Sequence, residues 1–458
     1  MTLDLASLSF AGAPSIRVLP PGPQSRDYLD YQFSHEGGVV SYPRGMPMAI
    51  RRAKGATVED MDGNLYIDFF SGAGVMAVGH GNPAVLEAVQ EQLLELTHAL
   101  DFPNRARRQL VEALFEILPP ALTRVSFGGP TGSDAVESAI KLAKYNTRRF
   151  PVLAFEGAYH GMTAGALSLC SGAAFKEDLL PLIPEVHFAP YAYCYRCAFG
   201  RSAASCQLEC AAYVDHLLDD PHSGVAKPAA VIVEPIQGEG GSIVPPPQFM
   251  SRIREACDRH GVLLIADEIQ AGLGRTGSMF SFEHSGIVPD IVTMSKALGG
   301  IGLPISGIAY REALNTWPAG KHIGTFRGNV VAYAAGAAAL RFMAEQHLTE
   351  HVLALGAEML TWLKELEASS PIVGEARGKG LMLGIEFVKD KATKAPAPDF
   401  ARSVRSEGHR RGLLIEIGGH YSNVARFLPP LILTREMARK GCDVFAEAVQ
   451  EVVKTLRA

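Results

Sequence analysis

The sequence predicts an α/β fold whose central sheet is mainly parallel. Between about residues 105 and 310, helical patterns alternate with short runs that are almost wholly apolar. Such runs are typical of strands that helices cover on both faces. Three of them lie at residues 229–233, 262–266 and 291–294. The chain length of 458 residues exceeds what one small core needs and favours a second domain.

The first part of the chain is predicted to form an arm, followed by strands and a helix. Residues 1–26 have no basic start and end in a stretch of Pro, Gly and Ser, so we expect a flexible arm and no signal peptide. A strand-like pattern covers about residues 42–70, with turns at residues 54–55 and 62–63. Apolar residues at helical spacing then predict a helix at residues 82–96.

The last part of the chain is predicted to form a smaller α+β domain. A long helical pattern runs from Leu348 to Leu366. Strand-like runs follow at residues 381–388 and 412–417, before a last helix. This mixture differs from the regular alternation upstream, so a separate domain is expected.

Charge and composition exclude several classes of partner. The net charge of −5 provides no basic field for a nucleic-acid backbone. No apolar run reaches the length of about 18 residues that a membrane span needs. The seven cysteines are an odd number in a long chain, which favours a reducing cytoplasm. We therefore expect a cytoplasmic protein with neither a nucleic-acid nor a membrane partner.

Polar residues directly follow the three apolar runs. Glu234 follows the first, Asp267 the second, and Lys296 comes one residue after the third. Because open parallel sheets bind ligands at the carboxyl ends of their strands, we expect these side chains to meet at one edge. Burial there lowers the pKa of a lysine amine, which suits a Schiff base with an aldehyde. The alternative is a lysine that points to solvent, but Asp267 and the glycines at 299–300 favour the first interpretation.

Two glycine-rich motifs suit a flat ligand that carries a phosphate. The first opens a helix, and its Gly132 and Ser133 are expected to offer backbone N–H groups to an anion at the positive end of the helix dipole. Its spacing is not that of a P-loop. The second places Tyr159 and His160 between glycines, where a flat ring can stack. The alternatives are an ordinary helix entry and a tight turn with a packed tyrosine.

Together these motifs resemble the class III, fold type I aminotransferases, which depend on pyridoxal 5′-phosphate (PLP). The resemblance covers about residues 42–434 and rests on residues 267–270, 272–277 and 295–300 in combination. It implies an enzyme with PLP as cofactor, a small-molecule amino donor and an oxo acid as substrates, and a homodimer with shared active sites. The implied parts are a large α/β domain and a smaller α+β domain, at residues 76–345 and at residues 27–75 with 346–458.

The resemblance implies a role for each motif residue. Lys296 would carry the cofactor and move a proton between the substrate Cα and the cofactor C4′. Asp267 would pair with the pyridine nitrogen and keep it protonated. Tyr159 would stack on the ring, and Gln270 would lie near its 3′-oxygen. The other implied cofactor contacts are Gly132, Ser133, His160, Glu234 and, from the other subunit, Thr325.

Two charged residues match a substrate gate of related ω-aminotransferases. Glu239 corresponds to a carboxylate that pairs with an arginine, and Arg426 corresponds to that arginine. While it is paired with Glu239, Arg426 would not be available to bind a carboxylate, and an amine substrate could enter the site. Once released, it would hold the α-carboxylate of an amino or oxo acid through two parallel hydrogen bonds. The alternative is a structural ion pair.

Departures from the family pattern concern the substrate pocket. Met162 stands where 4-aminobutyrate and ornithine enzymes carry an arginine for a distal carboxylate, and Arg327 is the candidate substitute. Tyr42 matches the first pocket tyrosine of ornithine enzymes, but Ala73 replaces the second. The stretches that look closer to 2,4-diaminobutyrate:2-oxoglutarate aminotransferases are residues 129–132, 159–162, 325–329 and 415–419. The implied donor is therefore the terminal amine of 2,4-diaminobutyrate, and the implied acceptor is 2-oxoglutarate.

Other outcomes of the same chemistry stay open. A class III racemase, epimerase or lyase would use the same Lys296, Asp267 and Tyr159. Another ω-amino acid aminotransferase would differ in its donor. A PLP-binding regulator without enzyme activity would need an attached DNA-binding module, but the N-terminal arm is short and not basic.

Four cysteines form a separate motif. Cys194, Cys197, Cys206 and Cys210 follow a C-x2-C-x8-C-x3-C spacing. Four thiols so close in sequence are a candidate zinc site, and free cysteines or a disulfide pair are the alternatives. PLP chemistry requires no metal, so no metal is expected at the active site.

Overall fold

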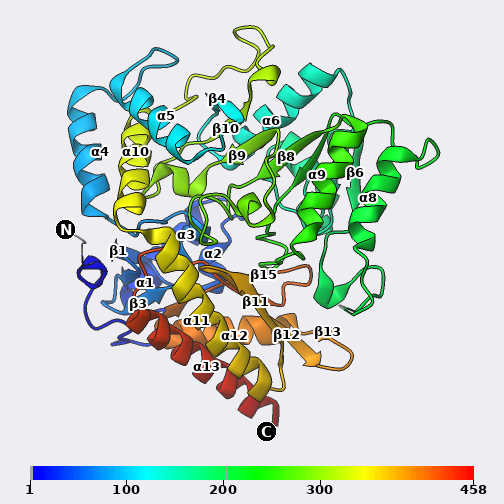
Figure 1. The fold of residues 1–458 in the computed structure, drawn as a ribbon. Helices are drawn as coiled ribbons and strands as arrows, with labels where there is room; N and C mark the ends of the chain where they lie inside the picture. The colour runs from blue at the N-terminus through cyan, green and yellow to red at the C-terminus, as the bar shows by residue number, and fades with distance from the viewer. Residues whose placement is uncertain (1–3, 203, 458) are drawn as a thin grey trace. The chain divides into compact units, whose positions relative to one another are not determined.

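The computed structural model describes residues 4–202 and 204–457. The chain divides into two compact units (Figure 1). Residues 84–342 form one, which we call the central unit. The described residues up to Pro83 and from Met343 onward form the other, which we call the terminal unit because both chain ends contribute to it.

The central unit is built on a seven-stranded sheet. Strand β10 runs antiparallel to both of its neighbours, whereas the strands from β9 to β6 run parallel to one another. The predicted α/β fold with a mainly parallel sheet is therefore confirmed. In spatial order the strands are β4 (Leu122–Phe127), β10 (Gly307–Arg311), β9 (Ile291–Met294), β8 (Leu263–Asp267), β7 (Ala230–Val233), β5 (Val152–Phe155) and β6 (Val186–Ala189).

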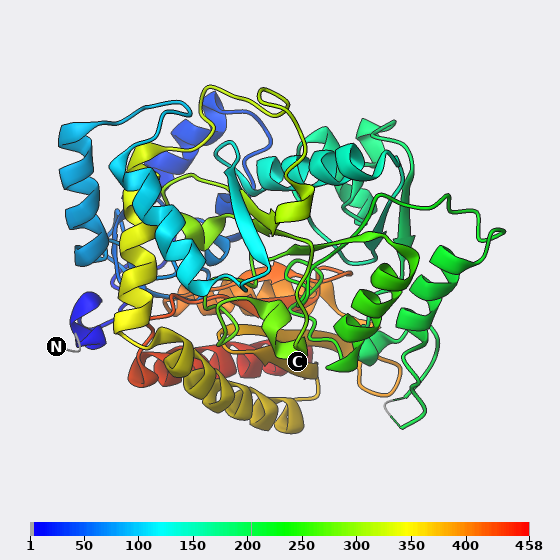
Figure 2. The same ribbon diagram turned by 45° about the horizontal axis from the view of Figure 1, so that its top comes forward.

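The apolar runs form the buried middle of this sheet. Every residue of β7 and β9 is buried, as expected for strands covered on both faces. Figures 1 and 2 show α8 and α9 side by side next to the sheet. The helices of the central unit are α4 (Pro83–Glu95), α5 (Arg105–Ile117), α6 (Gly132–Thr147), α7 (Ala164–Ser168), α8 (Glu209–Asp219), α9 (Gln248–His260) and α10 (Val330–Glu345).

Helix α6 begins where the first glycine-rich motif ends. Thr131 is its N-cap and forms a capping box with Asp134. The helix ends at Arg148, whose φ of +58° is left-handed. Its apolar stripe packs into the core of the central unit with the strands, as helical spacing predicts. The buried residues of that stripe include Val136, Ala139, Ile140 and Ala143.

The terminal unit contains two sheets, one of which joins segments from both chain ends. In one, β14 pairs in parallel with β3, so a C-terminal strand completes an N-terminal sheet. The strand order is β1 (Ile50–Lys54), β2 (Thr57–Asp60), β3 (Leu65–Asp68) and β14 (Leu413–Leu414). The other sheet has the order β11 (Val373–Lys379), β12 (Met382–Asp390), β16 (Val424–Phe427) and β15 (Glu416–Gly418), with β13 (Ala395–Pro396) beside β12. The helices are α1 (Pro23–His35), α2 (Tyr42–Gly45), α3 (Ser71–Gly74), α11 (Leu348–Ser369), α12 (Pro398–Arg410) and α13 (Arg435–Arg457).

The first segment of the chain is anchored on this unit. Ser15 forms a bridge with Leu65, and the Asn64 side chain accepts a 2.7 Å hydrogen bond from the Arg17 backbone N–H. Residues 15–18 of the predicted arm thus form hydrogen bonds with residues 64 and 65, and the flexibility of the arm stays a prediction. Its Pro- and Gly-rich composition conceals hydrogen bonds to residues that lie far away in sequence. Within the described ranges, no helix combines the length and apolar character of a membrane span.

Candidate active site

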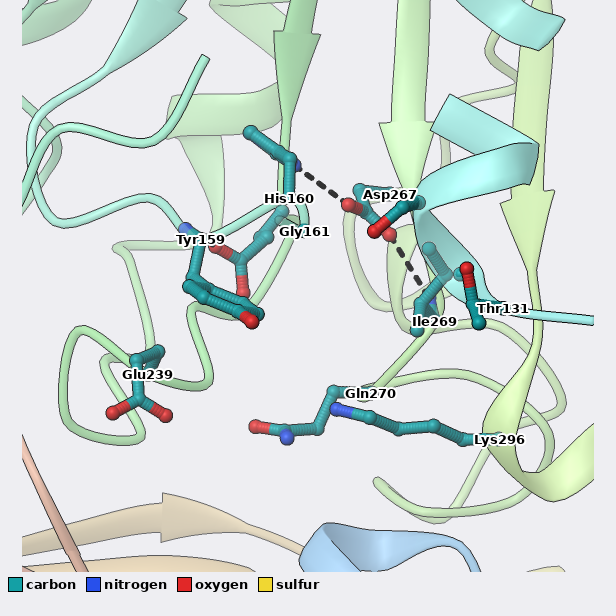
Figure 3. Close-up of a pocket in the computed structure, with 12 residues that line it drawn as sticks. Thr131, Tyr159, His160, Gly161, Glu239, Asp267, Ile269, Gln270 and Lys296 are labelled. Carbon is teal, nitrogen blue, oxygen red and sulfur yellow. Dashed lines mark hydrogen bonds and ion pairs between the residues drawn. The ribbon is translucent and has the colours of Figure 1, made fainter. Parts of the chain in front are cut away.

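The carboxyl ends of four parallel strands place the predicted residues around one cavity. Tyr159 follows β5, Glu234 follows β7, Asp267 ends β8 and Lys296 follows β9. Because these strands run in the same direction, the four residues reach the same edge of the sheet. They line a cavity of about 220 Å³ (Figure 3).

The N-terminus of α6 forms another wall of this cavity. Gly132 and Ser133 are its first residues, and Thr131 also lines the cavity. A Cβ at Gly132 would lie 3.0 Å from the Ile269 side chain, and a Cβ at Gly161 would lie 2.1 Å from Ser133 Oγ. Both glycines are therefore needed for close packing around the start of the helix. The helix dipole makes this wall attractive to an anion.

Asp267 is held by hydrogen bonds on both of its oxygens. Oδ2 lies 2.6 Å from His160 Nδ1, and Oδ1 accepts hydrogen bonds from Thr293 Oγ1 at 2.9 Å and from the Ile269 backbone at 3.1 Å. Burial disfavours charge on His160, but the hydrogen bond to Asp267 and the charges of Asp267 and Glu234 raise the His160 pKa above its ordinary value. The buried pair therefore keeps a negative carboxylate in a fixed direction.

Glu234 connects two loops at the edge of the sheet. Its Oε1 accepts a 3.1 Å hydrogen bond from the Tyr159 backbone, and its Oε2 accepts a 2.9 Å bond from the Gly238 backbone. Burial raises the pKa of Glu234 to about 7; the charge of Asp267 adds to the rise and that of His160 opposes it. These bonds assign Glu234 to positioning the tyrosine loop.

Lys296 stands in a tight turn that packs against α10. Its φ of +43° lies in the left-handed region, which residues other than glycine seldom adopt. Ser295 Oγ donates a 2.8 Å hydrogen bond to the Ile305 carbonyl, and a Cβ at Gly300 would lie 3.0 Å from the Ala335 carbonyl. Figure 3 shows the Lys296 side chain extending into the cavity toward Gln270. The backbone of this turn therefore directs the amine into the site.

Most of the predicted site residues of the central unit line this cavity. They are Gly132, Ser133, Tyr159, His160, Glu234, Glu239, Asp267, Gln270 and Lys296. The prediction did not include Thr131, Gly161 and Ile269, which also line it. The capping box of α6 was a signal for Thr131, and the motif around Tyr159 was a signal for Gly161. Ile269 lies between two polar residues, and no local pattern indicates the direction of its side chain.

Three predicted residues of the central unit do not line the cavity in this chain. Thr325 is exposed, and Met162 is half-exposed, with its backbone N–H donating to Ser133 Oγ at 3.1 Å. Arg327 forms an ion pair with Asp101 and also donates to the His322 carbonyl. Its guanidinium is therefore already engaged by a carboxylate.

The remaining predicted residues belong to the terminal unit. The Tyr42 ring lies 5.2 Å from that of Phe70, and Ala73 has a left-handed φ of +61°. Arg426 is buried and forms an ion pair with Glu416. Glu239 and Arg426 lie in different units, so their pairing stays a prediction.

The four-cysteine motif converges on a small cavity without forming a metal site. Its thiols line a space of about 20 Å³. Among the described residues, no group of three or more His, Cys, Asp or Glu side chains is arranged to hold a metal ion. Burial raises the pKa of Cys210 to about 11, with Cys206 and Cys194 adding to the rise. The described side chains are therefore not arranged as the zinc hypothesis requires.

Comparison with protein families identifies this arrangement. The model of the family described as aminotransferase class-III matches residues 40–449. The chain belongs to the class-III aminotransferases. The predicted resemblance is thus confirmed, and it covers both units.

Relatives of this class-III aminotransferase share most of its length. A diaminobutyrate–2-oxoglutarate aminotransferase of Rhizobium meliloti is 42% identical over 89% of both chains. One of Haemophilus influenzae is 39% identical over 94% of this chain and 97% of its own. Among solved structures, the ornithine aminotransferase of Toxoplasma gondii has a TM-score of 0.83 and 28% identity, covering 95% of this chain and 96% of its own. A thermostable omega transaminase from Pseudomonas jessenii has a TM-score of 0.85 and 27% identity, covering 92% of this chain and 98% of its own.

The cavity of this class-III aminotransferase fits its cofactor, PLP. An aldehyde requires an amine, which Lys296 provides, and a pyridine nitrogen requires a carboxylate, which Asp267 provides. A phosphate requires N–H donors, and the start of α6 offers them beside the glycines that leave room for close approach. Tyr159 supplies an aromatic face in the same cavity. The residues present therefore match each part of the cofactor.

Proposed function

We propose that this enzyme transfers the terminal amine of 2,4-diaminobutyrate to 2-oxoglutarate. The observation that carries the chemistry is the single cavity lined by Lys296, Asp267 and Tyr159 at the carboxyl edge of the sheet. The substrate pair is supported by the relatives named diaminobutyrate–2-oxoglutarate aminotransferase, which match over most of both chains.

Each residue of the site has a defined task in this proposal. PLP, when bound, supplies a carbonyl carbon that takes up the amine and a ring that withdraws electrons from it. The Lys296 amine would then accept the proton from the substrate Cα and deliver it to the cofactor C4′. Asp267, fixed by His160 and Thr293, keeps a negative charge beside the ring nitrogen.

Substrate selection is proposed to rest on three charged residues. Glu239 lines the cavity, where a carboxylate attracts the amine of a donor. Arg426 is proposed to take the α-carboxylate, since a guanidinium matches a carboxylate in two parallel bonds. Arg327 stays the candidate for the distal carboxylate, which then has to compete with Asp101.

A homodimer with shared active sites is part of the same proposal. Large apolar side chains are exposed on neighbouring segments of the central unit, with Phe102 at 71%, Ile323 at 70% and Phe326 at 73%. The Phe326 ring lies 5.8 Å from that of His98, so the two segments meet. A second copy would cover this surface. The exposed Thr325 lies beside it, where it can serve the partner's site.

A cytoplasmic location is also proposed. Its support is that none of the seven cysteines, all of which the structure describes, forms a disulfide bond, as is usual in a reducing compartment.

A panel of amino donors tests the substrate proposal. 2,4-Diaminobutyrate, ornithine, 4-aminobutyrate and alanine are each offered to the PLP-loaded enzyme, with 2-oxoglutarate and with pyruvate as acceptors. We expect the highest kcat/KM with 2,4-diaminobutyrate and 2-oxoglutarate. Preference for another donor would replace the substrate pair. Racemisation or elimination without amine transfer would replace the reaction class.

A further inference from the structure

Glu416 and Arg426 face each other on neighbouring strands of the terminal unit. Strands β15 and β16 run antiparallel, and the two residues are direct register partners. Arg426 Nη2 lies 2.7 Å from Glu416 Oε2. The side chain of Arg426 is fully buried and that of Glu416 is 11% exposed, so water and salt screen the pair weakly.

A second guanidinium also lies near Glu416. Arg405 in α12 is partly buried, and this helix packs against β15. Burial and the nearby Arg402 hold the Arg405 pKa below its usual range, while the charge of Glu416 opposes them. Glu416 therefore neutralises a site with two positive groups, and its removal leaves both without that compensation.

The expected gate residue Glu239 differs from Glu416 in one respect. Glu239 belongs to the central unit, whereas Glu416 and Arg426 belong to one sheet of the terminal unit. A partner on the adjacent strand moves with the arginine, because the backbone ladder holds the two strands in register. The pairing of Glu416 with Arg426 is thus internal to one sheet.

We propose that Glu416 is a positioning residue that sets the affinity of Arg426 for the substrate carboxylate. The inference rests on the proposed function, in which Arg426 takes the α-carboxylate of the oxo acid. Glu416 gives the guanidinium a fixed direction and lowers its attraction for a further anion. Moderate affinity suits a site that has to bind the oxo acid and release the product amino acid in each catalytic cycle.

The central test is binding of glutarate, a dicarboxylate without a reactive carbonyl. Titration calorimetry on the PLP-loaded enzyme measures its Kd, and steady-state kinetics give KM and kcat for 2-oxoglutarate. Glu416→Gln keeps the side-chain shape and an acceptor oxygen but removes the charge. We expect Kd and KM to fall at least about fivefold, with kcat changed less than about twofold, because a nearby repulsive charge has been removed.

A matched control is available in the central unit. Asp290 lies between Arg254 and Arg311, with ion-pair distances of 2.8 and 2.9 Å. It precedes β9 and so lies at the edge of the sheet opposite Lys296. Asp290→Asn removes a carboxylate from between two arginines without touching the site. It is expected to lower the melting temperature and to leave the glutarate Kd unchanged.

The variants separate failure of the inference from failure of the proposed function. An unchanged Kd in Glu416→Gln, while Arg426→Ala weakens binding, overturns the inference alone. Equal tightening in Asp290→Asn overturns it as well. An unchanged Kd in Arg426→Ala overturns the proposed role of Arg426 and the inference with it. If Glu416→Gln does not fold, Glu416→Asp, which withdraws the charge by one methylene, is expected to tighten binding by a smaller factor, and no tightening there overturns the inference.

Discussion

The central and the terminal unit hold their functional charges with different kinds of partner. In the central unit, Asp267 is bonded by a histidine, a threonine hydroxyl and a backbone N–H, and Glu234 is bonded by two backbone N–H groups. In the terminal unit, Arg426 is paired with a carboxylate on the next strand. Of these donors only His160 can carry an opposite charge, and Asp267 raises its pKa; the others fix a carboxylate without offsetting its charge, whereas the ion pair with Glu416 offsets the charge of Arg426.

This difference separates a rigid centre for chemistry from an adjustable centre for recognition. A charge that must act on the cofactor in every cycle has to be held in place and kept at full strength. A charge that binds and releases substrates needs a partner that lowers its attraction for them. Substitutions of Lys296 and Asp267 should therefore change kcat, and substitutions of Arg426 should change KM.

The largest effect is expected at Lys296. Lys296→Ala should abolish turnover, because no other group in the cavity can supply the amine. PLP should still bind noncovalently, since α6 and Asp267 remain. Borohydride reduction of the wild-type holoenzyme, followed by peptide mapping, should label Lys296, and a label on any other lysine would contradict the assignment.

Asp267→Asn is expected to have the next largest effect. The rate should fall by about two to four decades, because the amide no longer holds the ring nitrogen protonated. His160 should also lose the partner that raises its pKa. The fold should persist, as checked by circular dichroism, and near-normal kcat would remove Asp267 from the site.

Arg426→Ala tests the adjustable side of the comparison. Loss of a buried, charge-assisted contact should raise the KM for 2-oxoglutarate by about thirtyfold or more. The effect on the donor half-reaction should be much smaller if Glu239 silences the arginine there. Single-turnover rates of each half-reaction make the measurement, and equal effects in both would indicate a plain structural pair.

Arg327→Ala should have a smaller effect, because Asp101 already competes for the guanidinium. We expect the use of 2-oxoglutarate to weaken by about tenfold, with little change for pyruvate, which has no distal carboxylate. Asp101→Asn is the control, since it breaks the same ion pair and leaves the arginine present. A role in bracing alone would make both variants depress both acceptors alike.

The smallest effect concerns stability and pH. Burial raises the pKa of Glu268 from 4.5 to about 8, so the folded protein holds this proton more tightly than the unfolded chain. The stability that Glu268 contributes is therefore fully present below its pKa in the unfolded chain, and it is lost as the pH rises through its pKa in the folded protein. Between these two pKa values the melting temperature should fall as the pH rises. Glu268→Gln should make that fall smaller by at least about 3 °C.

A surface carboxylate provides the comparison for that measurement. The pKa of Glu312 lies below its ordinary 4.5 because of its hydrogen bond to Arg124. Glu312 therefore titrates below the pH range between the two pKa values of Glu268. Glu312→Gln should leave the fall in melting temperature across that range unchanged. If the fall in melting temperature is the same in Glu268→Gln as in the wild type, Glu268 does not titrate in that pH range.

The sheet and its polar edge could be predicted from local patterns. Buried strands have short apolar runs, and a polar residue directly after such a run has to lie at the strand end, as Glu234 and Asp267 do. The side chains that hold them could not be predicted in the same way. Thr293 contacts Asp267 because β8 and β9 pair in parallel with these residues in register.

Long-range register also explains what the sequence reasoning missed in the terminal unit. The pairing of Glu416 with Arg426 depends on the register of β15, a strand of three residues, and the strand-like pattern around it does not indicate its partner strand. Asn64 anchors residues 17 and 18 from more than forty positions away. The cysteine motif shows the converse, because its local spacing suggested a metal site that the described side chains do not assemble.

The left-handed backbone of Lys296 links the activity of the enzyme to its stability. A lysine with a φ of +43° costs about 1–2 kcal/mol relative to a relaxed conformation. Glycine adopts the same φ without strain. A lineage that gave up the chemistry could therefore gain stability by replacing this one residue with glycine. Selection for the amine would therefore hold lysine at this position against the stability that glycine offers.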